Sequence, residues 1–89
     1  MNNISFGGFR IFSLTGMERA MGMVPHTGVP AFKTFEAAQE TLKRLPKFAT
    51  ENTRFHNADT FIHRIVADEN TPMSKIVEIL KKNLNHSFI

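Results

Sequence analysis

Residues 4–14 read ISFGGFRIFSL, and the apolar side chains of this stretch leave little polar surface on either face of an extended chain. This pattern predicts a strand from Ile4 to Leu14 that is covered on both sides. Gly7 and Gly8 interrupt it, and paired glycines within a strand mark a bulge, a bend or the close approach of another backbone. We therefore expect a long buried strand at the start of the domain.

Two amphipathic helices are predicted further along the chain. Apolar residues at spacings of three and four predict the first from Phe35 to Leu45, after the N-cap residue Thr34 and before Pro46. Thr71 followed by Pro72 is typical of a helix start, and this second helix runs to about Leu84. Its predicted core stripe consists of Met73, Ile76, Val77, Leu80 and Leu84.

The remaining segments predict a loop and a hairpin. Glycines and Pro25 break up residues 15–28 into a loop with one helical turn at Met17–Met21, and a short extended piece follows at Val29–Lys33. Thr53–His56 and Thr60–Ala67 predict a β-hairpin. Its turn consists of Asn57, Ala58 and Asp59.

These elements predict one α+β domain over residues 1–89, in the order β-α-β-β-α. We expect a mainly antiparallel sheet of three or four strands with both helices on one face. The other face would then be open, and its apolar side chains would form a contact surface.

Composition excludes several classes of protein. A chain of 89 residues with 42% hydrophobic and 21% charged residues is neither disordered nor long enough for two cores. It has no cysteine, which excludes a disulfide scaffold and a thiolate metal site. The start of the sequence lacks a signal-peptide pattern, and no stretch is apolar enough to cross a bilayer, so we expect a cytoplasmic protein.

No motif predicts an enzyme, a cofactor or a metal site. His26, His56, His63 and His86 are the residues suited to bind metal or to act as a base at neutral pH, but no two lie four apart as in a helical zinc site. The sequence has no nucleophile elbow, phosphate loop or dinucleotide-binding glycine pattern. We therefore expect a binding protein without enzymatic activity.

The loop at residues 15–28 carries the candidate residues for a protein partner. Met17, Met21 and Met23 offer the adaptable apolar contacts found at binding surfaces, and Glu18 and Arg19 add polar anchors. The alternative is that these methionines fold back over the sheet and complete a small core.

Nucleic-acid binding is the second function that the sequence allows. The net charge is +3, and six basic residues fall on predicted strands or near the end of the first helix. They are Arg10, Lys43, Arg44, Lys47, Arg54 and Arg64. A homodimer joined through strand edges or helices is compatible with either function.

In size and composition the chain is similar to small accessory proteins of phages and other mobile elements. This similarity implies inhibition of a host enzyme or defence complex by covering its surface. We therefore expect a protein partner first, a nucleic acid second, and no membrane.

Overall fold

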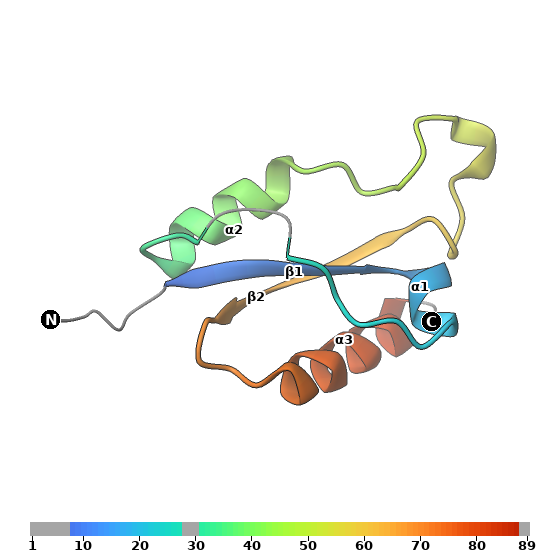
Figure 1. Ribbon diagram of the computed structural model, residues 1–89. Helices are drawn as coiled ribbons and strands as arrows, with labels where there is room; N and C mark the ends of the chain where they lie inside the picture. Colours follow the sequence, from blue (N-terminus) through green and yellow to red (C-terminus); the bar gives the residue numbers. More distant parts are fainter. Residues whose placement is uncertain (1–7, 28–30, 88–89) are drawn as a thin grey trace, which may run out of the picture.

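The computed structural model describes residues 8–27 and 31–87, and side chains as far as Lys82. Its elements are β1 (Phe9–Thr15), α1 (Gly16–Ala20), α2 (Phe35–Arg44), the 3-10 helix η1 (Thr53–Phe55), β2 (Ile62–Asp68) and α3 (Met73–Ser87) (Figure 1). Two antiparallel strands and three α-helices in this part of the chain confirm the α+β class. Residues 4–7 of the predicted first strand, together with Gly28, Val29 and Pro30, lie outside the described residues.

β1 and β2 pair antiparallel, with Phe9 opposite Asp68 and Thr15 opposite Ile62. A third or fourth strand and the order β-α-β-β-α are not found among the described residues. On the outer edge of β1, His26 and Phe32 instead form isolated bridges with Ser13 and Phe9. Prolines lack the N–H that a regular ladder needs, and Pro25 directly precedes His26 in this flanking segment.

Gly8 directly precedes β1, and its surroundings admit only a glycine. It is buried at a φ of 89°, and a Cβ at this position would collide with the backbone carbonyl of Phe32. The backbone of Phe32 also exchanges two hydrogen bonds with Phe9, of 2.8 and 2.7 Å. Of the three alternatives for the paired glycines, the close approach of another backbone is the one found at Gly8, while Gly7 lies outside the described residues.

The predicted hairpin between Thr53–His56 and Thr60–Ala67 is wrong. The first of these segments forms η1, because the Asn52 side chain caps the Arg54 N–H at 3.0 Å and so favours a helical turn over a ladder. The chain does turn after Asn57, whose Oδ1 accepts from the Asp59 N–H at 2.9 Å. However, the chain after this turn, at residues 60–62, forms its hydrogen bonds with residues 47–49 rather than with Thr53–His56. β2 itself pairs with β1, which lies near the start of the sequence.

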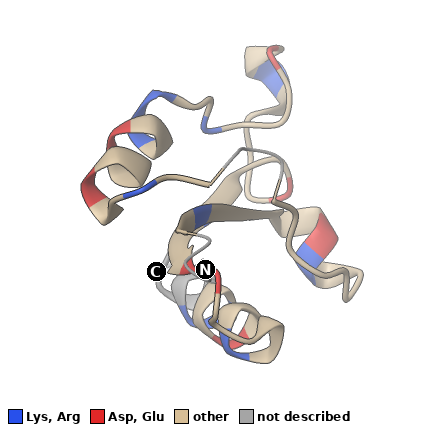
Figure 2. Cartoon of the chain, turned by 60° about the vertical axis from the view of Figure 1, so that its left-hand side comes forward, with Lys and Arg blue, Asp and Glu red and all other residues tan. Residues whose placement is uncertain are grey.

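The two longer helices cover opposite faces of the sheet, so the prediction that both lie on one face is corrected. Figure 1 shows α2 on one side of the strands and α3 on the other, and Figure 2 shows the same arrangement from a second direction. Neighbouring strand residues point to opposite faces, yet Ile11 and Phe12 are only 2% and 6% exposed. The sheet is therefore the middle of three layers, and neither of its faces is open.

The core lies mainly between the sheet and α3. Its buried cluster consists of Phe12, Leu14, Ala67, Ile76 and Leu80. On the other side, Ala38 is the buried residue of α2, and Phe35 and the Phe9 ring meet edge to face at 6.0 Å. Both helices occupy nearly the predicted ranges, and Thr34 caps α2 by accepting from the Ala37 N–H at 3.1 Å. In the described part of the chain, no helix is both long and apolar enough for a membrane span.

Candidate functional site

α1 begins with a capping box that fixes the corner after β1. The Thr15 hydroxyl accepts from the Glu18 N–H at 3.1 Å, and Glu18 Oε1 accepts in return from the Thr15 N–H at 2.9 Å. Such reciprocal bonds satisfy two backbone donors that a helix start otherwise leaves unpaired. The predicted helical turn near Met17–Met21 is therefore confirmed at Gly16–Ala20.

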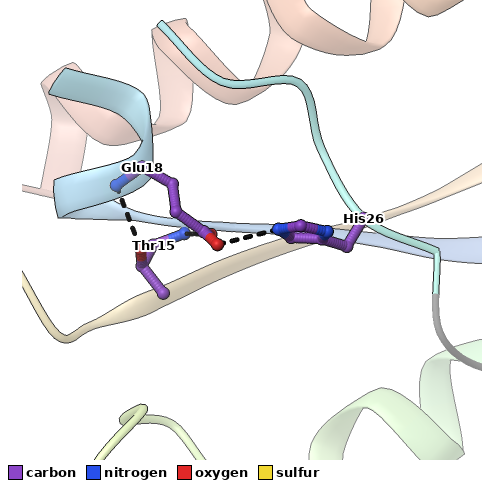
Figure 3. Close-up of polar contacts among 3 residues, drawn as sticks. All are labelled: Thr15, Glu18 and His26. Carbon is purple, nitrogen blue, oxygen red and sulfur yellow. Dashed lines mark hydrogen bonds and ion pairs between the residues drawn. The ribbon is translucent and has the colours of Figure 1, made fainter. Parts of the chain in front are cut away.

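The segment after α1 is tied back to β1 through His26. His26 Nε2 lies 2.7 Å from Glu18 Oε2 (Figure 3), and its backbone exchanges two hydrogen bonds of 2.8 Å with Ser13. The hydrogen bond from the Thr15 backbone is the main reason that the pKa of Glu18 lies below its ordinary value. The contact with His26 lowers this pKa further, while burial opposes both effects. Glu18 thus binds the helix start and the returning loop as a carboxylate.

Backbone hydrogen bonds also hold the turn between these two anchors. The N–H groups of Met21, Gly22 and Met23 donate to carbonyls of α1, each at 3.0 Å. Gly22 adopts a φ of 74°, which is the left-handed conformation expected just after a helix end. Four apolar side chains are therefore presented on a segment whose backbone is fixed at several points.

These side chains form the surface that we call the methionine surface. Its members are Met17 (53% exposed), Met21 (68%), Met23 (43%) and Val24 (63%). The alternative in which the methionines complete the core is not realised, because all three are exposed. Val24 was missed in the sequence, where a single valine in a loop carries no distinguishing signal. Arg19, a predicted polar anchor, is partly buried. After burial, its positive charge is the second cause that lowers the pKa of His63.

The six basic residues predicted to bind nucleic acid are not all brought together on one surface. Arg10 pairs with Glu69 at 3.3 Å on the α3 side of the sheet. Arg64 lies opposite Ser13 in the strand register and so projects to the α2 side. Arg54 lies in η1, and Arg44 ends α2. Arg10 and Arg64 therefore do not share the face that the nucleic-acid hypothesis assumed.

Three of the six do line one cavity of about 580 Å³ between the end of α2 and the start of β2. We call it the basic groove; its lining residues are Leu42, Lys43, Leu45, Lys47, Phe61, Ile62, His63 and Arg64. Arg64 donates to the Pro46 carbonyl at 2.6 Å, and burial lowers the pKa of its guanidinium. Sequence reasoning missed this groove, because its walls come from two stretches of the chain, 42–47 and 61–64, that only the tertiary structure brings together.

An aromatic cluster beside the basic groove was also missed. Phe48 stacks on His56 with ring centroids 4.3 Å apart and meets Phe61 edge to face at 5.4 Å. Phe61 in turn meets His63 at 4.7 Å. Burial, followed by the charge of Arg19, lowers the pKa of His63 below its ordinary value. The cluster joins the linker at Phe48 to the first residues of β2.

The histidines whose side chains are described lie in different surroundings. His26 contacts Glu18, His56 Nε2 lies 2.9 Å from the Thr50 carbonyl oxygen, and His63 is buried under the aromatic cluster. The side chain of His86 lies outside the described residues. Among the described residues, no three His, Cys, Asp or Glu side chains are close enough to hold a metal ion.

Comparisons with protein families, curated proteins and solved structures find no match to this chain.

Proposed function

We propose that this chain is a small binding protein that covers a surface of a protein partner, with the methionine surface as its contact region. The observation that carries the proposal is the exposure of four apolar side chains on one short, hydrogen-bonded segment. Methionine is unbranched and polarisable, so it adapts to irregular partner surfaces. The proposed activity requires no reaction, cofactor or metal.

The fixed backbone of this segment favours binding. A flexible loop loses conformational entropy when a partner orders it, and a loop already held in its bound shape avoids much of that cost. The Thr15–Glu18 capping box and the Glu18–His26 contact supply such order before any partner arrives. Glu18 and His26 come from the same stretch of chain as the apolar side chains, and such a mixture is typical of interfaces with an apolar centre and a polar rim.

The energy available from this surface sets a limit on its role. Full burial of an exposed methionine or valine side chain contributes roughly 1.5–3 kcal/mol, and these four are on average only a little over half exposed, so a partner that buries them gains roughly 3–7 kcal/mol. Association itself costs an estimated ~4–15 kcal/mol in lost freedom of movement. The methionine surface alone therefore supports weak binding, and a tight complex needs contacts beyond it. A host enzyme or defence complex, the partner class expected from size and composition, stays a prediction.

The test is an affinity pull-down from lysate of the cells that encode the chain, with and without nuclease and at low and moderate salt. We expect a discrete protein partner that survives nuclease and salt and is lost in the triple variant Met17→Ser, Met21→Ser, Met23→Ser. The matched control is Phe55→Ser with Met73→Ser, because both residues are exposed and lie outside the methionine surface.

Two outcomes would contradict the proposal. Full recovery of the partner by the triple variant would show that another surface makes the contact. Recovery of nucleic acid, lost steeply between low and moderate salt, would favour phosphate binding by the basic residues instead.

A further inference from the structure

β2 has an edge whose backbone groups point away from β1. At the two ends of the sheet, the Glu69 N–H donates to Gly8 and the Gly16 N–H donates to Phe61. Hydrogen-bonded pairs alternate along an antiparallel ladder. The backbone N–H and C=O groups of residues 63, 65 and 67 therefore point toward β1, and those of residues 62, 64, 66 and 68 point away from it, toward the outer edge. The Ile62 N–H confirms this direction, because it donates outward to the Lys47 carbonyl at 2.8 Å.

Between Ile62 and Asp68, whose carbonyl accepts from the Thr71 N–H at 2.9 Å, this outer edge is unoccupied in the described part of the chain. No described residue exchanges a backbone hydrogen bond with the outward groups of Arg64 or Val66. The equivalent edge of β1 is covered, since His26 and Phe32 pair with it. The edge of β2 therefore offers donors and acceptors in the alternating order that an added strand requires.

The basic groove lies directly beside this edge. Leu42, Leu45 and Ile62 give it apolar walls, and Lys43, Lys47 and Arg64 give it positive charge. Among the described residues, no carboxylate lies within 4.0 Å of these three cations, whose positive charge is therefore not neutralised by a neighbouring ion pair. A groove of this composition is complementary to an occupant that is both apolar and acidic.

We propose that the basic groove and the edge of β2 together bind an extended acidic peptide segment of another protein, which adds to the sheet beside β2. The backbone of the segment pairs with Arg64 and Val66. Side chains of a strand alternate between its two faces, so only those on the α2 side of the segment point into the groove, where apolar ones contact its walls and carboxylates contact Lys43, Lys47 or Arg64. This site is separate from the methionine surface and shares no residue with it.

A peptide fits these groups better than a nucleic acid does. Phosphates accept hydrogen bonds but donate none, whereas the edge of β2 presents both N–H and C=O groups. Binding of single strands also depends on exposed aromatic faces. The Phe61 ring in the groove is instead engaged by Phe48 and His63. A second copy of this chain is disfavoured because its own β2 edge carries Arg64 and so lacks the acidic side chains that would complement the groove.

The test is an NMR titration of the ¹⁵N-labelled full chain with the capped heptapeptide acetyl-EEVVEEV-amide, which carries both Glu and Val on each face when it is extended. We expect shifts concentrated at the amides of Lys47, Arg64 and Val66, and at least tenfold weaker binding by the double variant K43E/K47E. The matched control is K33E/K81E, which makes the same change of charge at two exposed lysines outside the groove. Circular dichroism of each variant checks that the fold is retained.

A second peptide separates strand addition from simple charge attraction. The same heptapeptide with every backbone amide N-methylated keeps its carboxylates but cannot donate to a strand, so we expect it not to bind. Equal affinity for the methylated peptide, or no shift at Arg64 and Val66 with millimolar peptide, would overturn the proposal. The proposal would also be overturned if an oligothymidylate, and not the peptide, shifted the amide signals of Arg64 and Val66. A dimer that forms at higher protein concentration and shifts these signals without peptide would overturn it as well.

Discussion

Replacement of Ile11 by alanine tests the three-layer arrangement most directly. Ile11 is 2% exposed and lies on the face of the sheet that α2 covers. The change removes three buried carbons, which contribute about 0.8 kcal/mol each, or about 2.4 kcal/mol together. The cavity adds to this loss, and such substitutions cost about 2–5 kcal/mol in total. We expect a loss of about 3 kcal/mol in the free energy of unfolding.

This loss is large for a domain of this size. The free energy of unfolding of an 89-residue domain is about 4–13 kcal/mol, at about 0.05–0.15 kcal/mol per residue. Urea unfolding is followed by far-ultraviolet circular dichroism, because the chain has no Trp or Tyr for fluorescence. With a slope of about 1 kcal/mol per molar urea, the midpoint falls by about 3 M.

Two reference variants make the result interpretable. Phe12→Ala removes packing on the α3 face and should cost about 3–5 kcal/mol. Val24→Ala shortens an exposed side chain and should change stability by less than about 1 kcal/mol. If Phe12→Ala shows its full effect while Ile11→Ala costs less than about 1 kcal/mol, the face under α2 is not packed and the three-layer arrangement is refuted.

The other predictions concern a buried histidine, a crowded glycine and a helix cap. Burial lowers the pKa of His63 in the folded chain, so as the pH falls the unfolded chain binds a proton at this imidazole before the folded chain does. The free energy of unfolding therefore decreases as the pH drops below about 6.5. Urea midpoints at about pH 7 and about pH 5 should therefore differ less in His63→Gln than in the natural chain; an equal difference would contradict this. Gly16→Ala places a Cβ against the Ala58 carbonyl and should cost about 1–3 kcal/mol; an unchanged melting temperature would show that the two backbones are not in close contact. Thr34→Ala should cost about 1 kcal/mol through loss of the α2 cap. Thr34→Ser should keep most of that stability, and equal losses in both would rule out the cap as the cause.

The helices could be predicted from the sequence because their signals are local. Thr34 and Pro46 mark the ends of α2, and Thr71 with Pro72 marks the start of α3, within a few residues of the groups they affect. Apolar spacing also identified Ile76 and Leu80, the largest fully buried side chains in the described part of the chain. Caps and periodicity act within one or two turns, so no knowledge of distant contacts was needed.

The methionine surface was only half predictable. The cluster of Met17, Met21 and Met23 stood out in the sequence, but methionine suits both a core and a binding surface. Whether the side chains are buried depends on the direction in which α1 leaves β1. That direction depends in part on the contact of Glu18 with His26, which follows from the fold of the whole corner.

The sequence by itself determined the α+β class, the two longer helices and the apolar strands covered on both faces. The partner of β2, the placement of α2 and α3 on opposite faces, and the basic groove were decided only by the tertiary structure. Strand pairing and grooves join residues far apart in the chain, and such contacts leave no mark in local spacing. Asn57 and its neighbours correctly indicated a turn, but a turn does not specify which segment will lie beside it.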